Sequence, residues 1–126
     1  MAWLWVGLGG ACGAMLRYTI SLQLPVVLGQ FPWATWYANV IGCAFAGIFL
    51  AASEKFVLLQ GDGRLLLLVG FLGGFTTFSS FGLESFNLWR HGYIGLAVLY
   101  SLSSLLVGFA SVATLYYLGK QYLFLG

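Results

Sequence analysis

The sequence has very little charge. Only five of its 126 residues are Lys or Arg and three are Asp or Glu, which makes 6% charged residues, whereas a soluble domain carries about 25%. A chain so poor in charge cannot cover a water-exposed surface, and a formal net charge of +2 is too small to indicate a nucleic-acid interface. The composition therefore excludes an ordinary soluble domain and predicts a membrane protein.

Residues that enzymes and metal sites commonly use are also scarce. The chain has two cysteines and one histidine, and Cys12 and Cys43 lie in apolar segments without a CxxC or a Cys/His cluster, so neither a disulfide nor a zinc site is expected. An intramembrane enzyme needs a nucleophile with its base, or paired carboxylates. Because Glu84 is the only acid within any apolar segment, we expect no catalytic residues and no enzymatic activity.

Long apolar runs, by contrast, make up most of the chain. Four of them approach or exceed the roughly 20 residues that a helix needs to cross a bilayer: Ala2–Ile20, Trp33–Ser53, Leu65–Trp89 and Tyr93–Leu118. They predict an all-α polytopic membrane protein with four transmembrane helices, built as a single domain over residues 1–126. The short connections leave no room for a soluble catalytic domain.

Positive charges are nearly balanced between the two sides of this arrangement. Lys55, Arg64 and Lys120 fall on the side of the termini, and Arg17 and Arg90 fall on the other. Because an asymmetry in Lys and Arg sets the orientation of a membrane protein, this near balance predicts insertion in both orientations and permits an antiparallel homodimer.

Small residues recur at spacings of four, which lets helices approach closely. Gly9 and Gly13 form one such pair, and Ala38, Gly42 and Ala46 form a second series. Packing within the chain and a dimer interface explain this spacing equally well.

The third apolar segment combines two glycines with a row of hydroxyl groups. Gly73 and Gly74 weaken a helix, so we expect a break there at mid-membrane, where freed backbone groups must be buried in protein or line a cavity. Broken helices often mark ion or substrate sites. Thr77, Ser80 and Glu84 then follow on one stripe of the helix.

Other polar side chains complete an uncharged lining. Tyr100 and Ser104 share a face of the fourth segment, and Asn39 lies in the second. Such donors can replace the water shell of a small anion without trapping it as a fixed cation would. Phe78 and Phe81 are three residues apart, and the positive edge of a phenyl ring can also face an anion.

Three segments of the chain resemble the signature stretches of the Fluc, or CrcB-type, fluoride channels: GLGGACGAMLRY (7–18), ATWYANVIGCAFAG (34–47) and GFLGGFTTFSSFGLE (70–84). The resemblance implies a dual-topology antiparallel homodimer with two fluoride pores and a structural sodium ion at the dimer interface. It implies passive export of cytoplasmic fluoride across the cell membrane of a bacterium or archaeon.

The resemblance also implies roles for particular residues. Phe78 and Phe81 would contact fluoride with their ring edges, Asn39 would position this aromatic gate, and the backbone carbonyls of Gly73 and Thr76 would bind sodium. The rest of the implied fluoride pathway is polar: Thr77, Ser80, Glu84, Tyr100, Ser104 and, near a vestibule, Arg17.

The chain departs from the family pattern at two places. Its second motif reads Ala34-Thr35-Trp36 where Gly-Thr-Leu is common, and Gly108 stands where some members carry a serine, which leaves open whether Gly108 or Ser111 occupies the last polar site.

Some alternatives stay open at this stage. An ionised carboxylate beside an anion path would repel the anion. Glu84 therefore either carries a proton, accepts hydrogen bonds from hydroxyls or points away from the path. The alternative functions are a small four-helix drug/proton antiporter and a structural subunit of a larger complex.

Overall fold

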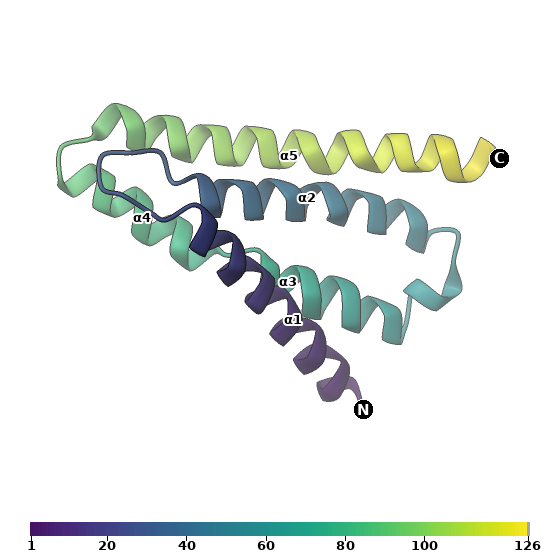
Figure 1. Cartoon of the computed structure of the whole chain (residues 1–126). Helices are drawn as coiled ribbons and strands as arrows, with labels where there is room; N and C mark the ends of the chain where they lie inside the picture. Colours follow the sequence, from purple (N-terminus) through teal and green to yellow (C-terminus); the bar gives the residue numbers. More distant parts are fainter. Residues whose placement is uncertain (126) are drawn as a thin grey trace.

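The computed structural model describes residues 1–125 as helices joined by short turns (Figure 1). The elements in chain order are α1 (Ala2–Gln23), α2 (Trp33–Ser53), the 3-10 helix η1 (Val57–Leu59), the π-helix η2 (Arg64–Leu72), α3 (Gly73–Phe75), α4 (Phe78–Arg90) and α5 (Ile94–Leu125). No strand occurs within these residues, so the all-α prediction is confirmed.

Three helical stretches in the described part of the chain are long and apolar enough to cross a membrane. They are Trp33–Ser53, Arg64–Arg90 and Ile94–Leu125, which agrees with three of the predicted segments. α1 has 22 residues, so its length of about 33 Å also matches the hydrocarbon core. Its glycines, tryptophans and Arg17 make it less apolar than the others, and the fourth span stays a prediction.

The last helix extends seven residues beyond the predicted end, from Leu118 to Leu125. The first two residues beyond the predicted end, Gly119 and Lys120, both contact the end of α2. A Cβ at Gly119 would lie 2.9 Å from Ala51, and the Lys120 ammonium contacts the Glu54 carboxylate at 2.6 Å. These tertiary contacts favour continuation of the helix where local sequence favours an end.

The helices pack in two groups, one around α5 and one around α1, and α2 contacts both. Figure 1 shows α2 lying along α5 and α1 crossing η2 and α3, and α4 packs against the first part of α5. The turn between α4 and α5 is closed by Gly92, whose φ of +89° suits glycine. The amides of Gly92 and Tyr93 donate to the carbonyls of Trp89 and Leu88, which forms a Schellman motif.

Glycines bring α1 into backbone contact with η2 and α3. A Cβ on Gly9 would overlap the carbonyl of Leu66, and a Cβ on Gly13 would overlap that of Phe71. Gly74 approaches the backbone of Gly10 in the same way. The sequence left two explanations for the small-residue spacing of α1. In the structure these glycines serve packing within the chain.

The helical path is interrupted at Thr76 and Thr77, which have extended backbones with φ/ψ of −86°/158° and −150°/126°. The expectation that the break lies at Gly73 and Gly74 is wrong in position. Gly73 is helical, with φ/ψ of −62°/−37°, and Gly74 belongs to α3. Gly74 allows α3 to approach α1 closely, because a Cβ at this position would overlap the backbone of Gly10. This role requires the small size of glycine and no unusual backbone angle.

Candidate functional site

A groove of about 470 Å³ lies beside the interruption, between α2, η2, the start of α4 and the middle of α5. Its wall is mostly apolar, and it includes seven of the residues singled out from the sequence: Asn39, Gly73, Thr76, Thr77, Phe78, Phe81 and Ser104. Residues far apart in the chain therefore meet at one place.

The side chain of Asn39 bonds the backbone N–H and C=O groups of Thr77, at the interruption of the helix. Its side-chain nitrogen donates to the Thr77 carbonyl at 3.0 Å, and its side-chain oxygen accepts from the Thr77 amide at 2.7 Å. A side-chain amide carries both a donor and an acceptor, so one residue satisfies both backbone groups. These two bonds leave the second hydrogen of the amide nitrogen unused, and Asn39 is a residue of the groove wall.

The two helix ends at the interruption have caps of their own. The Thr77 hydroxyl accepts from the amide of Ser80 at 3.2 Å, which is a standard N-cap for α4. The Thr76 hydroxyl donates to the Leu72 carbonyl at 2.8 Å. Ser80 therefore contributes its backbone to the cap of α4, and its side chain is not part of the groove wall.

Arg17 approaches the interruption from α1. Its Nε donates to the Gly74 carbonyl at 3.1 Å, and that carbonyl lies in the last turn of α3, where an unpaired C=O group is expected. A cation at this position also complements the negative end of a helix. The structure thus connects Arg17 to the helix end, and the groove wall does not include it.

Phe78, Phe81 and Tyr100 form a continuous aromatic stack. The ring centroids of Phe78 and Phe81 are 5.9 Å apart with planes 9° from parallel, and those of Phe81 and Tyr100 are 5.2 Å apart at 26°. Stacking occupies the ring faces and leaves the electropositive edges free. Phe78, at one end, is 87% exposed in the single chain, whereas Tyr100, at the other, is fully buried.

Glu84 is bonded to Tyr100, at one end of this stack, and is not part of the groove wall. Its two carboxylate oxygens accept one hydrogen bond each at 2.8 Å, from the hydroxyls of Tyr100 and Thr35. The sequence left three arrangements open for this carboxylate. In the structure it accepts hydrogen bonds from neighbouring hydroxyls.

The serines of α5 differ in what their hydroxyls do. The Ser103 hydroxyl donates to the Tyr100 carbonyl and accepts from the Trp36 indole, and that of Ser111 donates to the Val107 carbonyl. The Ser104 oxygen is buried and has no partner among residues 1–125. Ser104 is therefore a residue of the groove wall whose hydroxyl has no partner within the described residues. Neither Gly108 nor Ser111 lines the groove, so the choice between them for the last polar site stays open.

Three residues at this site were missed by the sequence analysis as functional candidates. Thr35 precedes Asn39 by four residues, and this spacing on one helix face was a usable signal. Phe31, in the connection before α2, and Trp36 pack near Tyr100. Their apolar character in an apolar sequence gave no signal, because only the tertiary structure brings them to Tyr100.

Comparisons with known proteins place the chain in one family. A family model described as "CrcB-like protein, Camphor Resistance (CrcB)" matches residues 4–116. The chain is 42% identical over 113 residues to a protein of Acidobacterium capsulatum, covering 89% of this chain and 90% of the other. It is 45% identical over 105 residues to a protein of Methylobacillus flagellatus, covering 82% of each. It is 44% identical over 107 residues to a Thermus thermophilus protein, covering 84% and 85%. Each of the three relatives is named "Fluoride-specific ion channel FluC".

Proposed function

The chain belongs to the family of CrcB-like proteins, and from this premise we propose that it is a fluoride-specific ion channel. It is a multi-pass membrane protein that transports an ion and catalyses no reaction. Residues 1–126 act as a single transmembrane channel domain, with α1 as the fourth span. Its place is the cell membrane of a bacterium or archaeon, where it exports fluoride from the cytoplasm.

The observation that carries this function is the groove that joins an amide, a free hydroxyl and phenylalanine rings. Ser104 has an unpaired hydroxyl, Asn39 has a second amide hydrogen, and Phe78 and Phe81 add ring edges. All of these groups are donors or electropositive edges without full charge. They compensate an anion for lost water and release it again, which conduction requires.

We propose a path that follows the aromatic stack. Fluoride enters the groove near Asn39 and Ser104, passes the edges of Phe78 and Phe81 and leaves beside Tyr100. Thr77 and Ser80 support the path at the start of α4, and Arg17 stands near its vestibule. Glu84 is held by Tyr100 and Thr35, so its oxygens are occupied by hydroxyl donors beside the exit. Selectivity over chloride follows from the small size of a passage lined by closely spaced donors.

The working unit we propose is an antiparallel, dual-topology homodimer with two pores. The nearly even distribution of Lys and Arg supports insertion in both orientations. The groove is open in the single chain and Phe78 is 87% exposed, so a second copy has a mostly apolar groove and an exposed aromatic ring to cover. Orientation is tested by placing a single cysteine at either end of the bundle and labelling intact cells with a reagent that does not cross the membrane. Only a protein inserted in both orientations is labelled at both ends.

A sodium ion at the dimer interface completes the proposal. We place the interruption between α3 and α4 at mid-membrane, as the break of the third transmembrane helix. Gly73 is the first residue of the short helix α3 and Thr76 is its C-cap, and both residues line the groove. Sodium, like other hard cations, prefers oxygen ligands, so the backbone carbonyls of these two residues, one set from each copy, suit it without any carboxylate.

The function is tested with purified protein in liposomes. Vesicles are loaded with potassium fluoride or potassium chloride, a potassium ionophore carries the balancing charge, and an ion-selective electrode records efflux without a pH gradient. We expect rapid fluoride release and little chloride release. Equal release of both ions contradicts selectivity, release only under a pH gradient favours an antiporter, and no release from folded protein contradicts the channel.

A further inference from the structure

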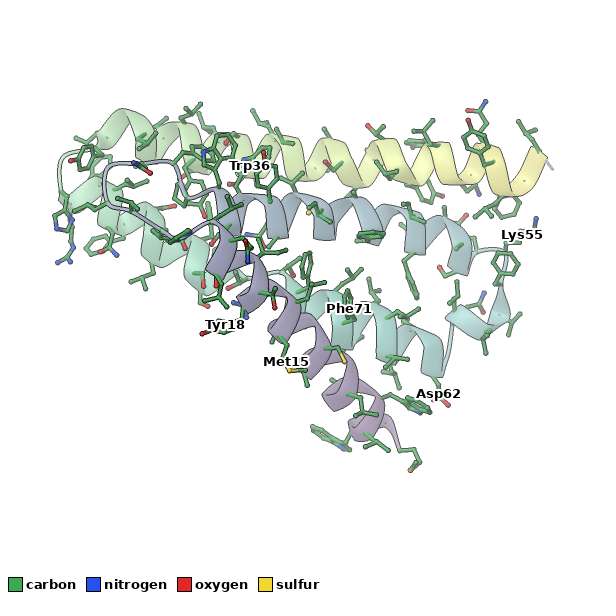
Figure 2. All side chains as sticks on the ribbon, in the orientation of Figure 1. Met15, Tyr18, Trp36, Lys55, Asp62 and Phe71 are labelled. Carbon is green, nitrogen blue, oxygen red and sulfur yellow. The ribbon has the colours of Figure 1, made fainter. Side chains whose placement is uncertain are left out.

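We propose that Phe31 and Trp36 are positioning residues for Tyr100 and, through it, for the exit of the fluoride path. The inference rests on the proposed function and assigns a task to two aromatic residues that do not line the groove. They come from the connection before α2 and from the first turn of that helix, which lies against α5 (Figures 1 and 2).

The Tyr100 ring is held between two other rings. Phe81 stacks on it at 5.2 Å, and Phe31 packs against it almost perpendicularly, with centroids 5.3 Å apart and planes at 83°. Both distances fall in the range of favourable aromatic pairs. Since Tyr100 is fully buried, its ring has little freedom to rotate while Phe31 is in place.

Trp36 holds the backbone of the same residue. Its indole nitrogen donates to the Ser103 hydroxyl at 3.1 Å, and that hydroxyl donates to the Tyr100 carbonyl at 3.3 Å. Trp36 also packs against Phe31, with ring centroids 6.1 Å apart. One indole N–H therefore connects α2 to the turn of α5 that carries Tyr100, at the position where this chain departs from the pattern Gly-Thr-Leu.

This network decides which hydroxyls of α5 face the ion. The bond from Trp36 occupies the Ser103 hydroxyl, whereas the hydroxyl of Ser104, a residue of the groove wall, has no partner within the described residues. The fixed ring of Tyr100 aims its hydroxyl at Glu84, 2.8 Å away. Loss of either support lets the Tyr100 hydroxyl leave Glu84, and the carboxylate then loses one of the two donors that shield it from the ion.

The test replaces the indole without removing a ring. Trp36→Phe deletes the N–H, and we expect fluoride efflux to fall roughly three- to tenfold, as the loss of one hydrogen bond implies. Trp89→Phe is the matched control, because Trp89 is exposed on α4 and contacts neither Tyr100 nor Ser103 by any bond described above. Its efflux should equal that of the wild type.

A double-mutant cycle separates positioning from a general structural role. In a Tyr100→Phe background there is no hydroxyl to position, so adding Trp36→Phe should reduce efflux no further. Phe31→Leu should reduce efflux, and Phe31→Tyr, which retains the ring, should preserve it. All variants are compared as monodisperse protein of equal elution volume.

The outcomes distinguish this inference from the function on which it rests. Wild-type efflux in both Trp36→Phe and Phe31→Leu overturns the positioning role, and so do losses that multiply with that of Tyr100→Phe, while the channel function stands. A wild-type protein that releases no fluoride overturns the proposed function itself.

Discussion

Single residues at this site do more than one task, and Asn39 is the clearest case. Its amide bonds both backbone groups of Thr77, and the same residue lines the groove with a second amide hydrogen that these bonds do not use. In a membrane each unsatisfied backbone group costs several kcal/mol, so the side chain that stabilises the interruption also supplies a polar group for the ion.

Asn39→Ala is expected to destabilise the protein by about 2 kcal/mol or more, because it leaves the N–H and C=O of Thr77 unpaired. Detergent unfolding curves measure the loss, and fluoride efflux should fall with it. Val40→Ala is the control, since it removes apolar atoms next to Asn39 and keeps the Asn39 bonds. Equal stability of the two variants would show that the Asn39 bonds contribute little.

Phe78 and Phe81 are predicted to conduct fluoride by their ring edges. Phe78→Ile and Phe81→Ile should each lower efflux at least roughly tenfold, or by about 1.4 kcal/mol in barrier, because the side chain remains apolar but has no electropositive edge. Folding should survive, at Phe78 above all, because its ring is 87% exposed. Phe86→Ile, on the same helix and 59% exposed, controls for loss of an aromatic residue. Normal efflux in both groove variants would exclude the aromatic path.

At the scale of the elements, the contacts between α1 and α3 fix the position of each helix relative to the other. The close contact at Gly10 and Gly74 brings α1 to α3, and Arg17 of α1 then reaches the carbonyl at the end of α3. The neighbouring glycines of α3 differ sharply: a Cβ on Gly74 would overlap the Gly10 backbone, whereas a Cβ on Gly73 would have its nearest neighbour at 3.9 Å.

This difference makes Gly74→Ala and Gly73→Ala a matched pair. Gly74→Ala should destabilise the chain by about 1–3 kcal/mol through overpacking, measured as a lower melting temperature in detergent. Gly73→Ala should leave the packing within the chain intact. If Gly73 faces its copy across the proposed dimer, it should weaken dimerisation and the sodium dependence of stability. Equal melting temperatures for the two variants would contradict the packing described for α1 and α3.

On the scale of the whole molecule, polar contacts tie the end of α2 to the end of α5. Glu54 accepts from the Tyr116 hydroxyl at 2.8 Å and from the Lys120 ammonium at 2.6 Å, and Lys55 (Figure 2) donates to the Leu123 carbonyl. The hydrogen bond from Lys120, followed by that from Tyr116, lowers the pKa of the Glu54 carboxyl. These contacts keep α5 helical beyond its predicted end.

The lowered pKa of Glu54 gives this connection a pH dependence. A depressed folded-state pKa stabilises the protein above the carboxyl's unfolded pKa of about 4.3, and the contribution disappears as the pH falls through the folded value. The melting temperature of the wild type should therefore exceed that of Glu54→Gln at neutral pH, and the two should converge in acid. High salt should reduce the difference, because the pair is exposed. Asp62→Asn, in the connection between η1 and η2, should not reproduce this convergence. A difference between wild type and Glu54→Gln that persists in acid would exclude ionisation of Glu54 as its cause.

The sequence by itself determined the membrane location, the helical class and the location of three spans, because the scarcity of charge and the length of apolar runs act locally. Through the resemblance of GGFTTFSSF and its companion segments it also named seven of the residues that line the groove, whereas the named residues Ser80, Glu84 and Tyr100 lie outside its wall. It misplaced the interruption, since glycine content does not reveal whether a glycine serves a turn or a close approach.

Only the tertiary structure decided which glycines contact another backbone, that Asn39 bonds Thr77 and that Ser104 alone among the discussed serines of α5 has a free hydroxyl. It also brought Phe31 and Trp36 to Tyr100. These outcomes depend on contacts between helices distant in the chain, where a hydrogen bond or a missing Cβ outweighs the local preference of any single segment.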